Sequence, residues 1–184
     1  MDLVPFGGVA DAHDVIAWPP DGDSRMNVTG YDEACAAAAR VRLPDGIEVR
    51  AVTLPGLLIL KVRAWAERHV EQPLKDAHDL YLILRRYLDA GNADRLYAEH
   101  AAWLTQSDFD YGTAGARLAG LDVRALLGQH SDRSDEIIAG LQHIIAPEID
   151  ADGQNRLVGE LRDDADAFRG YLIAFSQGLS GAVT

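Results

Sequence analysis

Lysine is almost missing from this chain, which has two lysines and fifteen arginines among its 184 residues. The two are Lys61 and Lys75, and both fall in one short stretch. Lysine is a compact point charge on a flexible stem and suits a phosphate, whereas arginine presents a planar fork. The two lysines either mark a place where a guanidinium would not serve, namely phosphate chemistry beside acidic residues, or reflect chance in an arginine-rich chain.

Cysteine is rarer still, because Cys35 is the only one. A single cysteine excludes an intrachain disulfide and a thiolate metal cluster. Its neighbours in the sequence Ala34-Cys35-Ala36-Ala37 predict a buried, unreactive thiol. Long hydrophobic runs are absent too: none approaches the roughly 18 apolar residues of a membrane span, and no basic-then-apolar leader opens the chain. These absences predict a cytoplasmic protein without a membrane segment.

Basic residues are outnumbered, with 17 Lys and Arg against 29 Asp and Glu and a formal net charge of −12. Such a surface repels nucleic acid over most of its area. The charge is uneven, because residues 40–68 carry six basic and three acidic residues, whereas the segment after His100 carries 6 − 13 = −7. A polyanion would therefore have to dock near Lys61, although a basic segment is also typical of an ordinary solvated face.

The pattern of apolar residues and turn signals predicts strands first and helices afterwards. Strands are expected over 2–6, 15–18, 40–43 and 47–52, and Pro44-Asp45-Gly46 joins the last two in a hairpin. A short helix is expected over 31–39, between the second and third strands. Helices are expected over 55–69, from Pro73 to Gly91, from Asn92 toward Trp103, over 122–127 and 135–145, and from about 154 onward. The final helix carries Phe168, Leu172 and Phe175 as a packing stripe.

This order predicts an α+β fold whose boundary falls near Leu54. Residues 1–54 would form a strand-rich portion and residues 55–184 a helical one. The length is enough to bury a core in one large domain or two small ones. The three tryptophans, Trp18, Trp65 and Trp103, are expected to anchor cores rather than to stack on bases. The six histidines show no metal-binding spacing.

Two neighbouring helices of the predicted set carry charged residues at helical spacing. In the first, Lys61, Trp65 and Arg68 follow one another at i, i+4 and i+7 and so share a face. In the second, Asp76 and Asp79 are i, i+3 neighbours. A tight turn between the helices would bring two cations and two carboxylates into one cleft.

This cleft has two interpretations. Its carboxylates could hold Mg²⁺ weakly or orient charged side chains while Lys61 and Arg68 grip phosphates. Alternatively, the four side chains form an interhelix salt-bridge network without chemistry. The second lysine, Lys75, stands at i, i+4 from Asp79, and we expect these two to pair.

The same segments resemble the third and fourth motifs of the AbiEii/AbiGii toxin class of nucleotidyltransferases, which read roughly Lys-Leu-x-Ala-x-x-x-Arg and Lys-Asp-x-x-Asp-Leu. They stand here as KVRAWAER over 61–68 and KDAHDL over 75–80. Residues 2–7 (DLVPFG) resemble the family's strand that bears a third metal-site carboxylate, and residues 53–57 (TLPGL) its lead into the lysine helix. The likeness covers about residues 1–127 and is densest between 53 and 84.

The resemblance implies a polymerase-beta-like nucleotidyltransferase fold, in which a mixed sheet backed by helices precedes a mainly helical domain. It implies transfer of a nucleotide from an NTP to an acceptor, an RNA such as tRNA or a protein, with Mg²⁺ as cofactor. An antitoxin protein would be a partner in a toxin–antitoxin or phage-defence system. The residues implied for nucleotide binding are Lys61, Arg68 and Lys75; those implied for catalysis are Lys61, Asp79 and Asp76; and the implied metal ligand is Asp2.

One part of the family pattern is missing from this sequence. The family's first motif is a Gly-Ser turn followed by Asp-x-Asp, and it should precede the strand at Asp2. The Asp-x-Asp strings at 21–23, 108–110, 150–152 and 164–166 follow no Gly-Ser turn and are typical of acidic surface. Without those carboxylates, two-metal catalysis lacks an obvious anchor. The chain is therefore truncated, which we favour, or degenerate, or completed by another chain.

Two functions other than catalysis fit the same residues. One is a non-catalytic interaction protein whose helical half binds a partner. The other is a nucleotide-binding module that holds an NTP without transferring it. The sequence leaves the activity of this chain open, because its phosphate-gripping motifs are present and its metal-binding motif is not.

Overall fold

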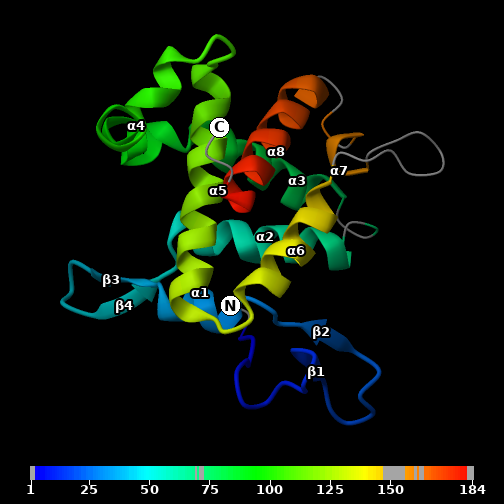
Figure 1. Ribbon diagram of the computed structural model, residues 1–184. Coiled ribbons are helices and arrows are strands. Elements are labelled where there is room, and N and C mark those ends of the chain that lie inside the picture. Colours follow the sequence, from blue (N-terminus) through cyan, green and yellow to red (C-terminus); the bar gives the residue numbers. More distant parts are fainter. Residues whose placement is uncertain are drawn as a thin grey trace.

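Helices build most of this molecule, and the strands all precede Leu54 (Figure 1). The computed structural model describes residues 3–68, 70, 73–146, 156–159, 161 and 164–181. The predicted α+β class is confirmed. Among the described residues, no helix is both long and apolar enough to span a membrane.

The strands form two separate antiparallel hairpins. Strand β1 (Val15–Ala17) pairs with β2 (Arg25–Asn27), and β3 (Ala39–Arg42) pairs with β4 (Glu48–Ala51). The hairpin predicted around Pro44-Asp45-Gly46 is confirmed, with Gly46 at a φ of +85° in its turn. The described residues thus contain hairpins in place of the mixed sheet that was expected.

The strand predicted over 2–6 is wrong for the part that the structure describes. Residues 3–6 are irregular, and a strand is stable only beside a partner strand, which they lack among the described residues. The Phe6 ring instead packs against Tyr31 with centroids 5.8 Å apart. Asp2 lies outside the described residues.

The helices follow the predicted order with several changed bounds. They are α1 (Tyr31–Ala36), α2 (Leu54–Arg68), α3 (Pro73–Arg86), α4 (Ala93–Glu99), α5 (Tyr111–His130), α6 (Ser134–Ile145), α7 (Arg156–Gly159) and α8 (Ala165–Ser180). A π-helical turn (Leu88–Asn92) separates α3 from α4, and Gly91 has a φ of +95° there. A 3₁₀ turn (Ala101–Thr105) follows α4. Residues 154 and 155, where the last helix was expected to begin, are outside the described part.

Helix α5 is far longer than the segment 122–127 that the sequence predicted. It begins at an Asp110 cap whose carboxylate accepts the N–H groups of Gly112 and Thr113, both at 3.1 Å. Glycines in its first half argue against a helix by propensity. Packing outweighs that preference, because the buried Gly120 of α5 lies against Gly178 of α8.

The core lies where α5 and α8 meet α2, α3 and α6. In Figure 1, α5 and α8 run beside one another with α2 and α3 lying across them. The predicted stripe of Phe168, Leu172 and Phe175 is fully buried. Trp65 and Trp103 are almost completely buried. Cys35 is half-buried rather than buried, since α1 lies at the edge of this core.

Two glycines on α5 make a matched pair for testing this packing. A Cβ at Gly120 would lie 2.2 Å from the Phe175 carbonyl oxygen, whereas one at Gly128 would meet nothing within 4 Å. We expect Gly120→Ala to lower the free energy of unfolding by about 1–3 kcal/mol through overpacking. Gly128→Ala should raise it by up to about 1 kcal/mol through helix propensity. Urea unfolding followed by circular dichroism measures both, and equal effects would contradict this account.

Candidate functional site

Helices α2 and α3 pack against each other and bring the two predicted motifs together. The Nζ of Lys61 on α2 donates to Oδ1 of Asp76 at 3.0 Å and also to Oδ2 of Asp79, both on α3. Arg68, two turns further along α2, donates from Nε and Nη2 to the two oxygens of Asp76 at 2.6 and 2.8 Å. The predicted meeting of two cations and two carboxylates is present, and we name these four residues the ion-pair cluster.

Asp76 is the centre of the ion-pair cluster. It is the buried charged residue of the described chain, with an exposed fraction of 0%. Burial raises the pKa of Asp76, but the hydrogen bonds from Arg68 and Lys61 outweigh it, so this pKa lies below its ordinary value. Burial lowers the pKa of Lys61, and its bonds to Asp79 and Asp76 more than reverse that effect. Asp76 and Lys61 are therefore both charged at neutral pH.

Lys75 does not join the ion-pair cluster. It is exposed, and it forms no hydrogen bond or ion pair with a described residue. The expected pair between Lys75 and Asp79 is therefore wrong, because Asp79 turns to Lys61 on the neighbouring helix. Trp65, predicted on the same face as Lys61, is turned into the core with an exposed fraction of 7%.

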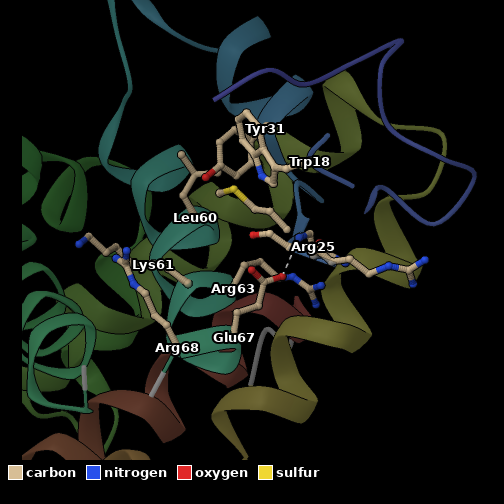
Figure 2. Close-up of a pocket in the computed structure, with 12 residues that line it drawn as sticks. Trp18, Arg25, Tyr31, Leu60, Lys61, Arg63, Glu67 and Arg68 are labelled. Atoms are coloured by element: carbon tan, nitrogen blue, oxygen red, sulfur yellow. Dashed lines mark hydrogen bonds between the residues drawn. The ribbon is translucent and has the colours of Figure 1, made fainter. Parts of the chain in front are cut away.

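A pocket of about 450 Å³ opens beside the ion-pair cluster, between α2, the β1–β2 hairpin and the start of α1, and Lys61 and Arg68 form part of its lining. Figure 2 shows the rings of Trp18 and Tyr31 at its upper end and Arg63 and Glu67 at its lower end, with Lys61 and Arg68 toward the left. The Glu67 carboxylate accepts the backbone N–H of Asn27 at 3.0 Å. That bond ties β2 to α2 and fixes one wall of the pocket.

Two arginines of this pocket lack a counter-ion at hydrogen-bond distance. Arg25 and Arg63 form no hydrogen bond or salt bridge with a described residue, and the Nε of Arg63 is buried without a partner. A buried donor left unmet costs about 1–3 kcal/mol. The pocket therefore presents cationic donors and aromatic rings together.

Sequence reasoning missed this pocket. Trp18 was expected in a core and lines the pocket half-buried instead, and neither Arg25 nor Arg63 was singled out. One signal was available: Leu60, Arg63, Ala64 and Glu67 of the lining follow one another at i, i+3, i+4 and i+7 and so share a face of α2. The contribution of the hairpin carried no comparable signal.

The described residues do not fit a magnesium site. They contain no group of three or more His, Cys, Asp or Glu side chains placed to hold a metal ion. The carboxylates of Asp76 and Asp79 are already bonded to Lys61 and Arg68, whose charges repel a dication. The predicted ligand Asp2 lies outside the described residues, so the Mg²⁺ that the resemblance implies has no site in this part of the chain.

Comparison with protein-family models matches residues 14–176 to the nucleotidyl transferase AbiEii toxin of type IV toxin–antitoxin systems. Because the match covers most of the 184 residues, the chain belongs to this family. The resemblance inferred from the lysine and aspartate motifs is confirmed. No curated protein matches the chain, and no solved structure does. The family is one of nucleotidyltransferase toxins.

The buried carboxylate gives a stability prediction with a defined pH dependence. Asp76→Asn should lower the free energy of unfolding at pH 7 by roughly 3 kcal/mol, because it leaves Lys61 and Arg68 without their shared anion. A carboxyl whose pKa is depressed on folding stabilises above its unfolded pKa of about 3.9, and that contribution is lost as the pH falls through the lower folded value. The difference between wild type and variant should therefore shrink below about pH 4.

The matched control removes a carboxylate from an exposed ion pair. Asp89 bonds Arg86 at 2.9 Å, with about 60% of each side chain exposed. Asp89→Asn should cost less than about 1 kcal/mol at any pH. Urea midpoints for both variants at pH 7 and pH 3 make the comparison. A pH-independent loss in Asp76→Asn would show that the carboxylate acts through packing alone.

Proposed function

We propose that this chain binds a nucleoside triphosphate in the pocket beside α2 and serves transfer of its nucleotide to an acceptor. The observation that carries the proposal is Lys61, held between two carboxylates at the wall of a pocket whose two further arginines, Arg25 and Arg63, form no salt bridge with a described residue. Membership of the nucleotidyltransferase toxin family supports the reaction class. Nucleoside triphosphates are cytoplasmic metabolites, so the proposal keeps the cytoplasmic location expected from the sequence.

Lys61 has the donors that this role needs. An ammonium group has three N–H donors, and Asp76 and Asp79 accept from it. One donor remains for a phosphate oxygen, and the two carboxylates fix the direction in which it points. A donor held in place in this way costs little reorganisation when charge builds up on a transferring phosphate. Asp76 and Asp79 are accordingly positioning residues for Lys61.

Arg63 and Arg25 would bind the remaining phosphates. Arg63 forms no hydrogen bond with a described residue, so its terminal guanidinium N–H groups can donate to phosphate oxygens. Glu67 places one negative charge in the same pocket, where it attracts Arg63, and its Oε1 accepts the Asn27 backbone N–H. The rings of Trp18 and Tyr31 line the pocket where a base can stack on them. Arg68 bonds to Asp76 and so holds that carboxylate in place for Lys61. Lys75 is exposed and lies outside the pocket.

The transfer step balances without a covalent enzyme intermediate. The acceptor's hydroxyl oxygen bonds to the α-phosphorus, the bond from that phosphorus to the bridging oxygen breaks, and pyrophosphate leaves. The hydroxyl proton passes to water. The acceptor is an RNA or a protein, and within a toxin–antitoxin system an antitoxin protein would oppose the activity. The alternative function is a nucleotide-binding module that binds the NTP without transferring its nucleotide.

Nucleotide binding can be measured through Trp18. Titration with each of the four NTPs should quench tryptophan fluorescence, and Trp18→Phe should remove the response because Trp65 and Trp103 are buried in the core. Arg63→Ala should weaken binding roughly tenfold to hundredfold, the value of a lost charged hydrogen bond. Arg86→Ala, which removes an exposed arginine far along α3, is the matched control and should leave affinity unchanged. Equal affinities for the two variants would place the nucleotide elsewhere.

Transfer is tested with α-labelled NTPs, Mg²⁺ and either tRNA or total protein as acceptor. We expect label in the acceptor with the wild type and at least about a hundredfold less with Lys61→Ala, because the fixed donor is lost. Asp79→Asn should retain NTP binding and lower the transfer rate, since it frees Lys61 to move. NTP binding without any transfer to either acceptor would favour the binding-module alternative.

A further inference from the structure

The β3–β4 hairpin sorts its side chains completely by face. Its register pairs Arg40 with Arg50, Val41 with Val49 and Arg42 with Glu48. Because side chains alternate along a strand, one face is apolar and the other is charged. The apolar face consists of Ala39, Val41, Leu43, Ile47, Val49 and Ala51, and the charged face of Arg40, Arg42, Glu48 and Arg50.

The described chain leaves this hairpin uncovered. Val41 is 40% exposed, Val49 38% and Ile47 56%. These exposed fractions are high for aliphatic side chains that share one face of a hairpin. Figure 1 shows the hairpin projecting from the helices. Each strand has one partner strand among the described residues, so both outer edges are open. A two-stranded sheet of this kind is marginally stable in water and is a template for a further strand.

The open edges have a defined hydrogen-bonding pattern. The Leu43 N–H donates to the Ile47 carbonyl at 2.8 Å inside the hairpin. By the alternation of an antiparallel ladder, Val41 and Val49 are also bonded to each other, and the N–H groups of Arg40 and Arg42 point to the open edge. An added strand beside β3 would therefore bond backbone atoms of the same residues that carry the positive charges.

The charge of the hairpin selects the chemistry of that strand. The charged face carries 3 − 1 = +2, in a chain whose net charge is −12. Arg40 directly opposes Arg50, and like charges facing each other across strands are destabilising. An acidic side chain of a strand beside β3 would lie next to Arg40 and Arg42 and offset this repulsion, while an apolar side chain on the opposite face would pack beside Val41 and extend the apolar face.

We propose that the β3–β4 hairpin binds an extended polypeptide segment with alternating apolar and acidic residues, which adds to its edge as a third strand. A nucleic acid would neutralise the arginines but leave the aliphatic face in water. A second copy of this hairpin would set six arginines against two glutamates on one face. The alternating acidic strand uses both faces and the edge together. This binding is independent of the pocket beside α2.

The probe is a dye-labelled seven-residue peptide in which valine and glutamate alternate, with lysine replacing glutamate in the comparison peptide. Fluorescence anisotropy should show binding of the glutamate peptide and at least about tenfold weaker binding of the lysine peptide. A block peptide of the same composition, with the valines together, should also bind at least about tenfold more weakly, because its charges fall on both faces of a strand.

Two double variants separate the apolar and charged contributions. Val41→Thr/Val49→Thr keeps β-branching and should weaken the glutamate peptide about tenfold. Arg40→Gln/Arg42→Gln should abolish the preference for glutamate over lysine, whereas Arg85→Gln/Arg86→Gln on α3 should preserve it. Unchanged helical circular dichroism shows that the variants fold. Equal binding of both peptides, a concentration-dependent dimer by light scattering, or stronger binding of a labelled homopolymeric RNA that is unaffected by Val41→Thr/Val49→Thr would each overturn the proposal.

Discussion

The carboxylate of Asp76 is the anchor on which the site depends. It has no contact with water, and it accepts three hydrogen bonds from the side chains of Lys61 and Arg68. A charge in this position is tolerated only because two opposite charges compensate its loss of hydration. The same contacts fasten α2 to α3 and aim the Lys61 ammonium group. Asp76, with Asp79 as the second acceptor of Lys61, therefore links the two helices and orients the lysine.

The helical scaffold determines how accurately this anchor is placed. Close contact between α5 and α8 at Gly120 and Gly178 gives the core a dense centre, against which α2 and α3 pack. The residues of α2 then divide among three surroundings. Leu58, Ile59, Val62 and Trp65 enter the core. Lys61 and Arg68 bond to α3 at the edge of the pocket, and Leu60, Arg63, Ala64 and Glu67 form the rest of the pocket wall on α2.

The sequence predicted those features that depend on spacing within one or two helices. The meeting of Lys61 with Asp79, the buried Phe168 stripe and the β3–β4 hairpin all follow from local periodicity or turn chemistry. Other features required contacts between distant segments. Helix α5 is extended through glycines by packing against α8, and Trp18 lines the pocket in a hairpin that the bond between Glu67 and the Asn27 backbone N–H ties to α2.

The pairing of Lys75 with Asp79 failed for a related reason. Spacing along one helix offered a partner at i, i+4, but it could not show that Lys61 on the next helix competes for the same carboxylate. Asp79 pairs with the half-buried Lys61 and not with the exposed Lys75, because an ion pair partly shielded from water is stronger than one at an exposed surface. Spacing along each helix thus predicted the residues of the ion-pair cluster, but the partner of Asp79 depends on how the two helices pack.

The division of α2 among core, partner helix and pocket has a mechanical consequence. Lys61 and Arg63 lie within the same turn of one helix and both line the pocket, but Lys61 is also bonded to the carboxylates of α3. Rotation of α2 about its own axis cannot move Arg63 without pulling Lys61 against its two carboxylates. The two ion pairs of Lys61 with α3 therefore fix the rotation of α2, and with it the orientation in which Arg63 is presented to a bound anion.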